Sequence, residues 1–159
     1  MSATITPVME RLLRKQNVAV VGTVSPSGTP NLSLKGVVEV DPKGFIYFMD
    51  LYRGKTRNNI KHDPRVALTV FSVMDFQGYQ FKGVASLIES GPKFDRMARA
   101  WAAKRRTILA KRIVHNIRQG HSHGRSETSL SLPKYLVKVQ VDKIYNLAPS
   151  SLRPAAVKP

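Results

Sequence analysis

The chain has 159 residues, of which 42% are hydrophobic, as expected for one globular domain with one core. Its 26 Lys and Arg against 10 Asp and Glu give a formal net charge of +16, which attracts polyanions such as nucleic acid, anionic membrane surfaces and phosphorylated small molecules. The lack of cysteine excludes disulfides and thiolate chemistry and fits a cytoplasmic protein. No apolar run is long enough for a membrane span, and the first residues lack the apolar core of a signal peptide.

The first part of the chain predicts short strands separated by turns. Residues 6–15 have the spacing of a short amphipathic helix, with Val8, Leu12 and Leu13 on its apolar face. Strands are predicted at 17–24, 31–40 and 45–51, and the third, rich in aromatic residues, is expected to be half-buried. A short helix is predicted within RGKTRNNIKHDPRV (53–66), followed by strands at 66–73 and 78–89.

Residues 91–120 form the one long helical pattern, with apolar residues at helical spacing. These residues are Phe94, Met97, Trp101, Ile108, Val114 and Ile117. Residues 92–119 hold nine Lys or Arg and a single acid, Asp95, so their net charge is +8, half of the total surplus. The Gly- and Ser-rich segment 120–133 is expected to be mobile, 135–147 to be a sixth strand, and 148–159 to be a flexible tail.

The order of these elements favours a mainly β (α+β) fold. Closely spaced strands with hairpin turns are typical of an antiparallel sheet, and closure into a small barrel removes its exposed edges. We therefore predict one domain over residues 1–147, with a helical and basic insertion at 92–133.

Most catalytic motifs are absent from the sequence. It contains no GxSxG nucleophile elbow, no Walker A motif and no GxGxxG after the first predicted strand. The four histidines are His62, His115, His121 and His123. The HSH pair has no carboxylate or third ligand nearby, so solvated loop histidines are favoured over a metal site.

The segment 53–66 is the strongest local candidate for a binding site. Gly54 permits a sharp turn or a close backbone approach just before a helix that starts at Lys55 and Thr56. A helix N-terminus with free N–H groups, a lysine and a hydroxyl would hold a phosphate. Asp63 and Pro64 end the helix. The segment alone supports equally well the alternative that its basic residues form a solvated face.

Three longer stretches, taken in order, resemble a known family. They are GTVSPSGTPNLSLKGVVEVDPKGFIYFMD, RGKTRNNIKHDPRVALTVF and GYQFKGVASLIESGPKFD, and over residues 6–98 they are similar to the pyridoxamine 5′-phosphate oxidase-like, FMN-binding split-barrel family. The resemblance implies a six-stranded antiparallel split β-barrel, a flavoprotein with oxidoreductase activity, and a homodimer with FMN in grooves at the subunit interface. The Arg and His set that binds substrate phosphate in true pyridoxamine-phosphate oxidases is not apparent toward the C-terminus, so the vitamin B6 reaction is not implied.

The resemblance also assigns roles to individual positions. The FMN phosphate would be held by Lys55 and Thr56 after Gly54, with help from Arg53 or Arg57. The isoalloxazine ring would lie beside Ser33, Leu34, Lys35 and Gly36. The ribityl chain would be flanked by Met49, Asp50 and Leu51, and Tyr79 and Gln80 would lie near the flavin or its phosphate. A cation such as Lys35 near the pyrimidine end would stabilise the anionic reduced flavin and raise its potential.

Other interpretations stay open at this point. Relatives of this barrel bind the oligoglutamate-tailed deazaflavin coenzyme, and the basic helix would attract its acidic tail. The same helix would suit a nucleic-acid-binding module, although it has one Trp and no aromatic series for stacking on bases. A further alternative is that the positive charge only keeps the protein soluble. The partners implied by the leading interpretation are a second copy of the chain and a small-molecule electron donor or acceptor, and no membrane.

Overall fold

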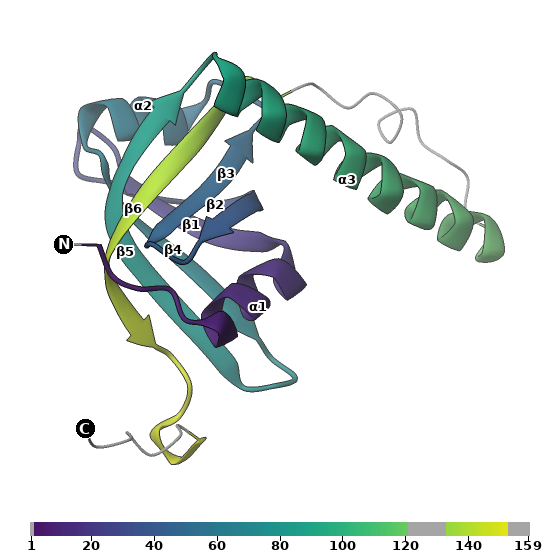
Figure 1. Ribbon diagram of the computed structural model, residues 1–159, viewed down its shortest axis with the longest axis horizontal. Helices are drawn as coiled ribbons and strands as arrows, with labels where there is room; N and C mark the ends of the chain where they lie inside the picture. Colours follow the sequence, from purple (N-terminus) through teal and green to yellow (C-terminus); the bar gives the residue numbers. More distant parts are fainter. Residues whose placement is uncertain (1, 121–132, 153–159) are drawn as a thin grey trace.

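The structure is a computed structural model, and it describes residues 2–120 and 133–152. Within these residues six strands close into one barrel: β1 (Val18–Val24), β2 (Pro30–Asp41), β3 (Phe45–Asp50), β4 (Arg65–Ser72), β5 (Gln77–Ile88) and β6 (Tyr135–Asn146). The strands follow one another around the barrel in the order β1-β2-β3-β6-β5-β4, and each neighbouring pair is antiparallel (Figure 1). The predicted closed antiparallel barrel is confirmed.

Three α-helices and one short 3₁₀ turn accompany the barrel in the described residues. They are α1 (Pro7–Gln16), α2 (Lys55–His62), α3 (Pro92–Arg118) and the 3₁₀ turn Ser150–Leu152. In Figure 1, α2 lies at one end of the barrel, and α3 starts there and extends away from it. The predicted strands and helices agree with these bounds to within two residues.

Helix α1 packs through a different face from the one predicted. Leu12 and Leu13 are buried as expected, but Val8 is 40% exposed. Met9 packs against the core in its place. The reason is helix geometry, because Met9 lies three and four residues before the two buried leucines and so shares one stripe with both.

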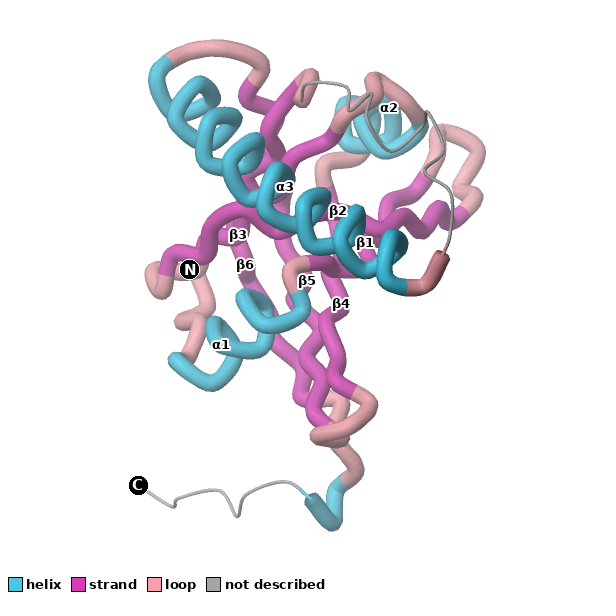
Figure 2. The backbone as a smooth tube through the Cα atoms, turned by 90° about the vertical axis from the view of Figure 1, so that its right-hand side faces the viewer, coloured by secondary structure: helices cyan, strands magenta, loops and turns pink. Residues whose placement is uncertain are grey.

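Strand β3 is buried on both faces, whereas the sequence predicted a half-buried strand. Its inward side chains, such as Phe48, belong to the main core inside the barrel. Its outward side chains, Tyr47 and Met49, are each 3% exposed and form a second cluster with Met97 of α3. The first turns of α3 therefore cover the outer face of β3, as the view from that side shows (Figure 2).

The apolar pattern of α3 serves the barrel only in the first half of the helix. Phe94, Met97 and Trp101 pack in the cluster outside β3. Farther along, Val114 is 49% and Ile117 is 63% exposed, because this part of α3 extends beyond the barrel (Figure 1). Residues 121–132, which include most of the segment expected to be mobile, and 153–159 of the expected tail lie outside the described residues.

None of the helices in the described part of the chain is both long and apolar enough to cross a bilayer.

Candidate functional site

Asp50, the last residue of β3, is the centre of a buried polar network. Its Oδ2 accepts a hydrogen bond from the Tyr135 hydroxyl at 2.7 Å and forms an ion pair with Lys35 Nζ. Its Oδ1 accepts a hydrogen bond from the backbone N–H of Leu51 at 2.8 Å. The side chains of Lys35 and Asp50 are only 12% and 9% exposed. Because Lys35 belongs to β2 and Tyr135 to β6, the network joins three strands at the point where β3 ends.

Tyr135 acts in this network as a hydrogen-bond donor. Burial raises the pKa of Tyr135 far above its ordinary value, and the hydrogen bond to Asp50 raises it further. The phenol therefore stays protonated, and the charges of Lys35 and Asp50 balance each other.

A cavity of about 420 Å³ lies beside this network, on the outer side of the barrel. It is lined by Asn17, Val18, Leu34, Lys35, Gly36, Val37, Met49, Asp50, Leu51, Tyr52, Trp101 and Arg105. These residues come from the end of α1 with the start of β1, the middle of β2, the end of β3 with the loop after it, and α3. The cavity thus brings together six of the residues that the sequence assigned to a flavin, from Leu34–Gly36 and Met49–Leu51.

Trp101 and Arg105 form the wall that α3 contributes to the cavity, and the sequence did not predict either as a site residue. The Arg105 guanidinium lies over the Trp101 ring, 4.2 Å from its centroid. Burial lowers the pKa of Arg105, while the nearby Tyr52 acts in the opposite direction. The spacing of four residues places both side chains on one helix face, which is the only signal that could have paired them.

The backbone of β2 has an open edge next to the cavity. Pairing between β2 and β3 stops at Gly36 and Met49, because β3 ends at Asp50. From Asn31 to Lys35, β2 pairs within the described chain only with β1. Alternate backbone N–H and C=O groups of this stretch therefore face away from β1 and have no strand partner. These groups could bind the polar edge of a planar ligand.

Helix α2 places the predicted phosphate-binding residues at different depths. The side chain of Lys55 is exposed and lines a smaller concavity of about 270 Å³ with residues from the β1–β2 turn. Thr56 is only 4% exposed, and its hydroxyl lies 3.1 Å from the Ser33 hydroxyl of β2. Lys55 and the first N–H groups of α2 are therefore the accessible part, and Thr56 fixes the helix against β2.

Gly54 precedes α2 at a bend of the chain, with its own backbone extended. Its φ of −99° and ψ of −152° are extended, and an added Cβ would meet no atom within 4 Å. The protein itself therefore gives no steric reason for glycine at this position. The helix ends before Asp63, as predicted, while Asn59 donates a hydrogen bond to Thr23 Oγ1 at 2.9 Å and Ile60 is buried.

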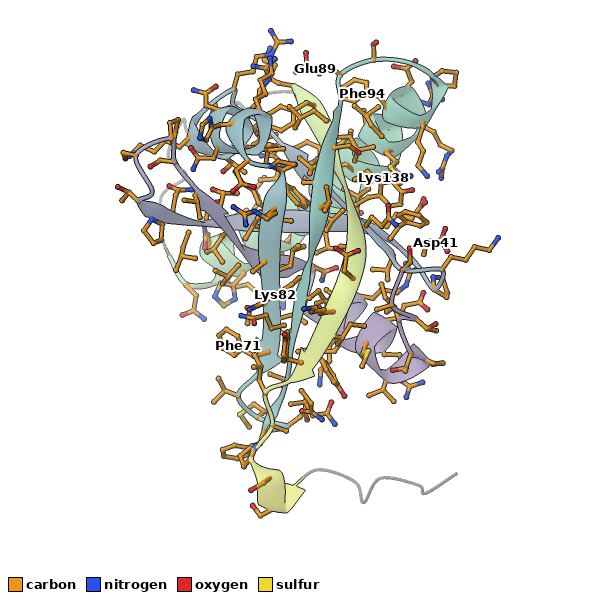
Figure 3. The ribbon with its side chains drawn as sticks, turned by 90° about the vertical axis from the view of Figure 1, so that its left-hand side faces the viewer. Asp41, Phe71, Lys82, Glu89, Phe94 and Lys138 are labelled. Carbon is orange, nitrogen blue, oxygen red and sulfur yellow. The ribbon has the colours of Figure 1, made fainter. Side chains whose placement is uncertain are left out.

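The two predicted arginine helpers share one carboxylate at the end of β5. Arg57 Nε donates to Glu89 Oε1 at 2.7 Å, and Arg53 Nη2 lies 3.9 Å from Glu89 Oε2. The hydrogen bond from Arg57 lowers the pKa of Glu89. Glu89 lies at one end of the barrel in Figure 3, with Phe71 at the other. Because Glu89 already balances part of this charge, Lys55 is the more direct candidate for a phosphate contact.

Tyr79 and Gln80 lie away from the cavity within one protomer. They pair with Val70 and Thr69 of β4 and with the last residues of β6, whereas Asp50 pairs with the first residue of β6. They are therefore at the opposite end of the barrel wall from the Asp50 network. A contact between these two residues and the same ligand would require a second protomer.

The described residues contain no group of three or more His, Cys, Asp or Glu side chains that could hold a metal ion. His121 and His123, the HSH pair, lie outside those residues.

The fold and the cavity define a small closed-barrel protein with a ligand-sized site on the outer side of its second and third strands. The sequence model of the family described as "Pyridoxamine 5'-phosphate oxidase" matches residues 5–127, and the chain belongs to this family. A curated relative, the uncharacterized protein MJ0282 of Methanocaldococcus jannaschii, is 32% identical over 79 residues. That match spans 48% of this chain and 52% of the relative, so it covers about half of the relative's length.

Three solved structures share the fold. HupZ of Group A Streptococcus is 23% identical, with a TM-score of 0.66 over 90% of this chain and 94% of its own. An F420 reductase is 16% identical, with a TM-score of 0.56 over 89% of this chain and 98% of its own. HutZ, the heme storage protein of Vibrio cholerae, is 16% identical, with a TM-score of 0.54 over 90% and 94% of the two chains. At these identities the likeness concerns the fold.

Proposed function

We propose that this protein is an FMN-binding oxidoreductase that works as a homodimer, with the flavin along β2 and its phosphate at the start of α2. The observation that carries the proposal is the cavity beside the open edge of β2, which gathers residues that the family resemblance assigns to the flavin. Its volume of about 420 Å³ is in the usual range for small-molecule sites, roughly 300–1,000 Å³.

The ring system of the flavin suits the chemistry of the cavity walls. Leu34, Met49 and Leu51 supply apolar contacts, and the open backbone edge of β2 supplies hydrogen-bonding groups. When bound, FMN would supply transfer of electrons between a small-molecule donor and an acceptor. Because Asp50 balances the charge of Lys35, this pair would hold β2 against the end of β3 more than it would raise the flavin potential.

The phosphate of the flavin would be held at Lys55 and the first turn of α2. The helix supplies N–H groups without side-chain caps, since the N-cap residue is Gly54. Lys55 is exposed beside them, and the two arginines that pair with Glu89 keep the surroundings positive.

Replacing Lys55 by alanine is expected to weaken FMN binding by about 10- to 100-fold, the usual effect of losing a hydrogen bond to a charged group. The affinity is measured by calorimetric titration of FMN into flavin-free protein. Lys61→Ala is the matched control, since Lys61 is an exposed lysine of the same helix. Equal FMN affinities of the two variants and of the unaltered protein would contradict the phosphate assignment.

A deazaflavin coenzyme is the second candidate for the same cavity. The observation in its favour is that Arg105 lines the cavity and that the part of α3 after it contains further basic residues. An acidic tail leaving the cavity would follow this segment, and an F420 reductase shares the fold. The absorbance spectrum of the purified protein and the mass of any released cofactor separate flavin from deazaflavin. A heme Soret band would contradict both.

The outer face of the barrel supports the proposed homodimer. Leu32 and Leu34 are 73% and 71% exposed, and they lie on the same side of β2. Leu32 borders a concavity of about 570 Å³ together with Val84 of β5 and three cationic side chains. Lys82, which Figure 3 labels, is one of these three cationic side chains. Exposed apolar side chains that gather on one face mark a contact with another protein surface.

A Leu32→Arg variant is expected to weaken the dimer by at least about 100-fold, because a further cation beside the three cationic side chains of this concavity is costly to bury in an apolar interface. Sedimentation velocity over a range of protein concentrations gives the dissociation constant. Val114→Arg is the control, since Val114 is an exposed apolar residue on the part of α3 that extends beyond the barrel. A Leu32→Arg variant that stays dimeric at the lowest concentration would refute this interface.

We further propose a cytoplasmic location, supported by the absence of cysteine.

We also propose that residues 1–147 act as one flavin-binding unit with 92–133 as an insertion, supported by the packing of α3 on the strand that lines the cavity.

A further inference from the structure

The distal half of α3, residues 106–118, has an apolar stripe that the barrel does not cover. Val114 is 49% and Ile117 is 63% exposed, and Ala110 is exposed as well. These residues are three or four positions apart, so they lie along one side of the helix. This half of α3 extends beyond the barrel (Figure 1). The stripe is separate from the cavity and from the concavity beside Leu32.

The distal stripe lies on the side of α3 opposite to the side that faces the barrel. Met97 and Trp101 mark the barrel-facing side, since they pack in the cluster outside β3. At about 100° of rotation for each residue, Ile117 is turned by roughly 200° from Met97, and Val114 by roughly 220° from Trp101. The two stripes therefore cannot contact the same surface. The barrel of the chain buries only the first of them, which leaves the distal stripe to another partner.

The charges of the distal half of α3 are all of one sign. Residues 106–118 contain four basic residues, Arg106, Lys111, Arg112 and Arg118, and no Asp or Glu, so their net charge is +4. Arg106 and Arg118 are exposed, and neither forms an ion pair within the part of the chain that the structure describes. A basic helix with an exposed apolar side is typical of segments that lie on a membrane surface.

An anionic lipid surface fits both the charge and the stripe, whereas nucleic acid fits only the charge. Phosphates of a nucleic acid would pair with the arginines and would leave Val114 and Ile117 in water. In a bilayer the anionic headgroups attract the cations, and the boundary between headgroups and acyl chains takes up the apolar side chains. Because the two stripes of α3 point in opposite directions, the barrel then lies on the water side of the helix.

We propose that residues 106–118 of α3 bind an anionic lipid surface, with Ala110, Val114 and Ile117 directed toward the acyl chains. The family resemblance implied no membrane partner, and this contact became apparent only from the exposed distal stripe. The helix lies in the headgroup layer and does not span the bilayer, in agreement with the lack of a long apolar run. The contact does not rest on flavin binding.

Co-sedimentation of the full-length protein with vesicles tests the proposal. One set of vesicles contains phosphatidylcholine alone, and the other also contains phosphatidylserine. We expect binding to the second set that weakens as salt is added, and much weaker binding to the first. Val114→Gln combined with Ile117→Gln keeps the charge and suits a helix. This variant is expected to bind at least about tenfold more weakly, because two aliphatic side chains are no longer buried.

The control for the apolar stripe is Val73→Gln combined with Met74→Gln. These two apolar residues lie in the turn between β4 and β5 and are 68% and 89% exposed. The control removes as many exposed apolar side chains as the α3 variant does, and it should bind the vesicles like the unaltered protein.

A second pair of variants tests the cations. Arg106→Gln combined with Arg118→Gln should weaken binding to the phosphatidylserine vesicles by about 25-fold, or about fivefold for each cation near an anionic surface. Lys61→Gln combined with Lys143→Gln removes the same charge from exposed positions on α2 and β6 and should have a much smaller effect.

Three results would overturn the inference. The first is absence of binding to the phosphatidylserine vesicles, and the second is an equal loss in the α3 variants and in their controls. The third is binding to duplex DNA that is tighter than binding to the vesicles and unchanged by Val114→Gln with Ile117→Gln, which would indicate nucleic acid as the partner. All of these measurements are made without flavin, so they are independent of the result with FMN.

Discussion

Replacing Gly83 by alanine is expected to destabilise the protein by at least about 3 kcal/mol, the upper end of the usual cost of overpacking. Gly83 lies at a register shift between β5 and β6. An added Cβ would overlap the carbonyl oxygen of Gln140, lie 2.8 Å from its carbonyl carbon and lie 3.0 Å from the Cα of Val141. All three atoms are backbone, so no change of rotamer can relieve the contact, and the two strands would have to separate.

The stability of the Gly83→Ala variant is measured by urea unfolding at fixed protein concentration, with thermal unfolding as a second readout. A loss of this size lowers the melting temperature by roughly 6–12 °C in a chain of this length. Gly36→Ala is the matched control, because it is also a strand glycine and its Cβ would meet Trp101 only at 3.7 Å. If both variants unfold at the same urea concentration, the close approach of β5 and β6 is not a constraint on this position.

Replacing Asp50 by asparagine is expected to cost about 3–5 kcal/mol, the usual effect of removing one partner of a buried ion pair. Asparagine keeps the shape of the side chain, but its single oxygen can replace only one of the two acceptors of Asp50, since Tyr135 donates to Oδ2 and the backbone of Leu51 donates to Oδ1. It leaves the ammonium group of Lys35, whose side chain is only 12% exposed, without the opposing charge. The expected loss therefore arises from an uncompensated buried cation.

Two further variants isolate the cause of this loss. Lys35→Met in the Asp50→Asn background removes the unbalanced cation and should recover most of the stability. Tyr135→Phe removes only the hydrogen bond from the Tyr135 hydroxyl to Asp50. It should cost about 1 kcal/mol for that bond, plus the cost of leaving one acceptor position of Asp50 unsatisfied. A double variant that is no more stable than Asp50→Asn alone would show that the charge of Lys35 is not the source of the loss.

Local sequence signals predicted the elements of the barrel because each depends on a few neighbouring residues. Pro64 and Asp63 ended α2 where predicted, since the restriction that proline places on the residue before it is local. The turn between the strands predicted at 17–24 and 31–40 is likewise local, and these strands pair as the β1–β2 hairpin. The phase of α1 was predicted wrongly because Met9 and Val8 are both apolar, and only the position of the barrel decided which one is buried.

The candidate site was predictable in part. The resemblance named Leu34–Gly36 and Met49–Leu51, and the structure lines one cavity with both groups. It did not name Trp101 or Arg105, because their position at the cavity depends on how α3 packs on the outer face of β3. Tyr79 and Gln80 were assigned to the same ligand, and this stays a prediction that requires a second protomer, because the register of β5 places them at the other end of the barrel wall.

Strand β2 shows most clearly what the sequence determines and what only the tertiary structure determines. Its alternation by itself determined that Ser33 and Lys35 lie on one face and Leu32 and Leu34 on the other, because successive side chains of a strand point to opposite sides. Only the tertiary structure decided that Lys35 meets Asp50 and that Asp50 meets Tyr135, a residue 85 positions farther along the chain. That contact exists because closing the barrel pairs β3 with β6, and no short stretch of sequence encodes this pairing.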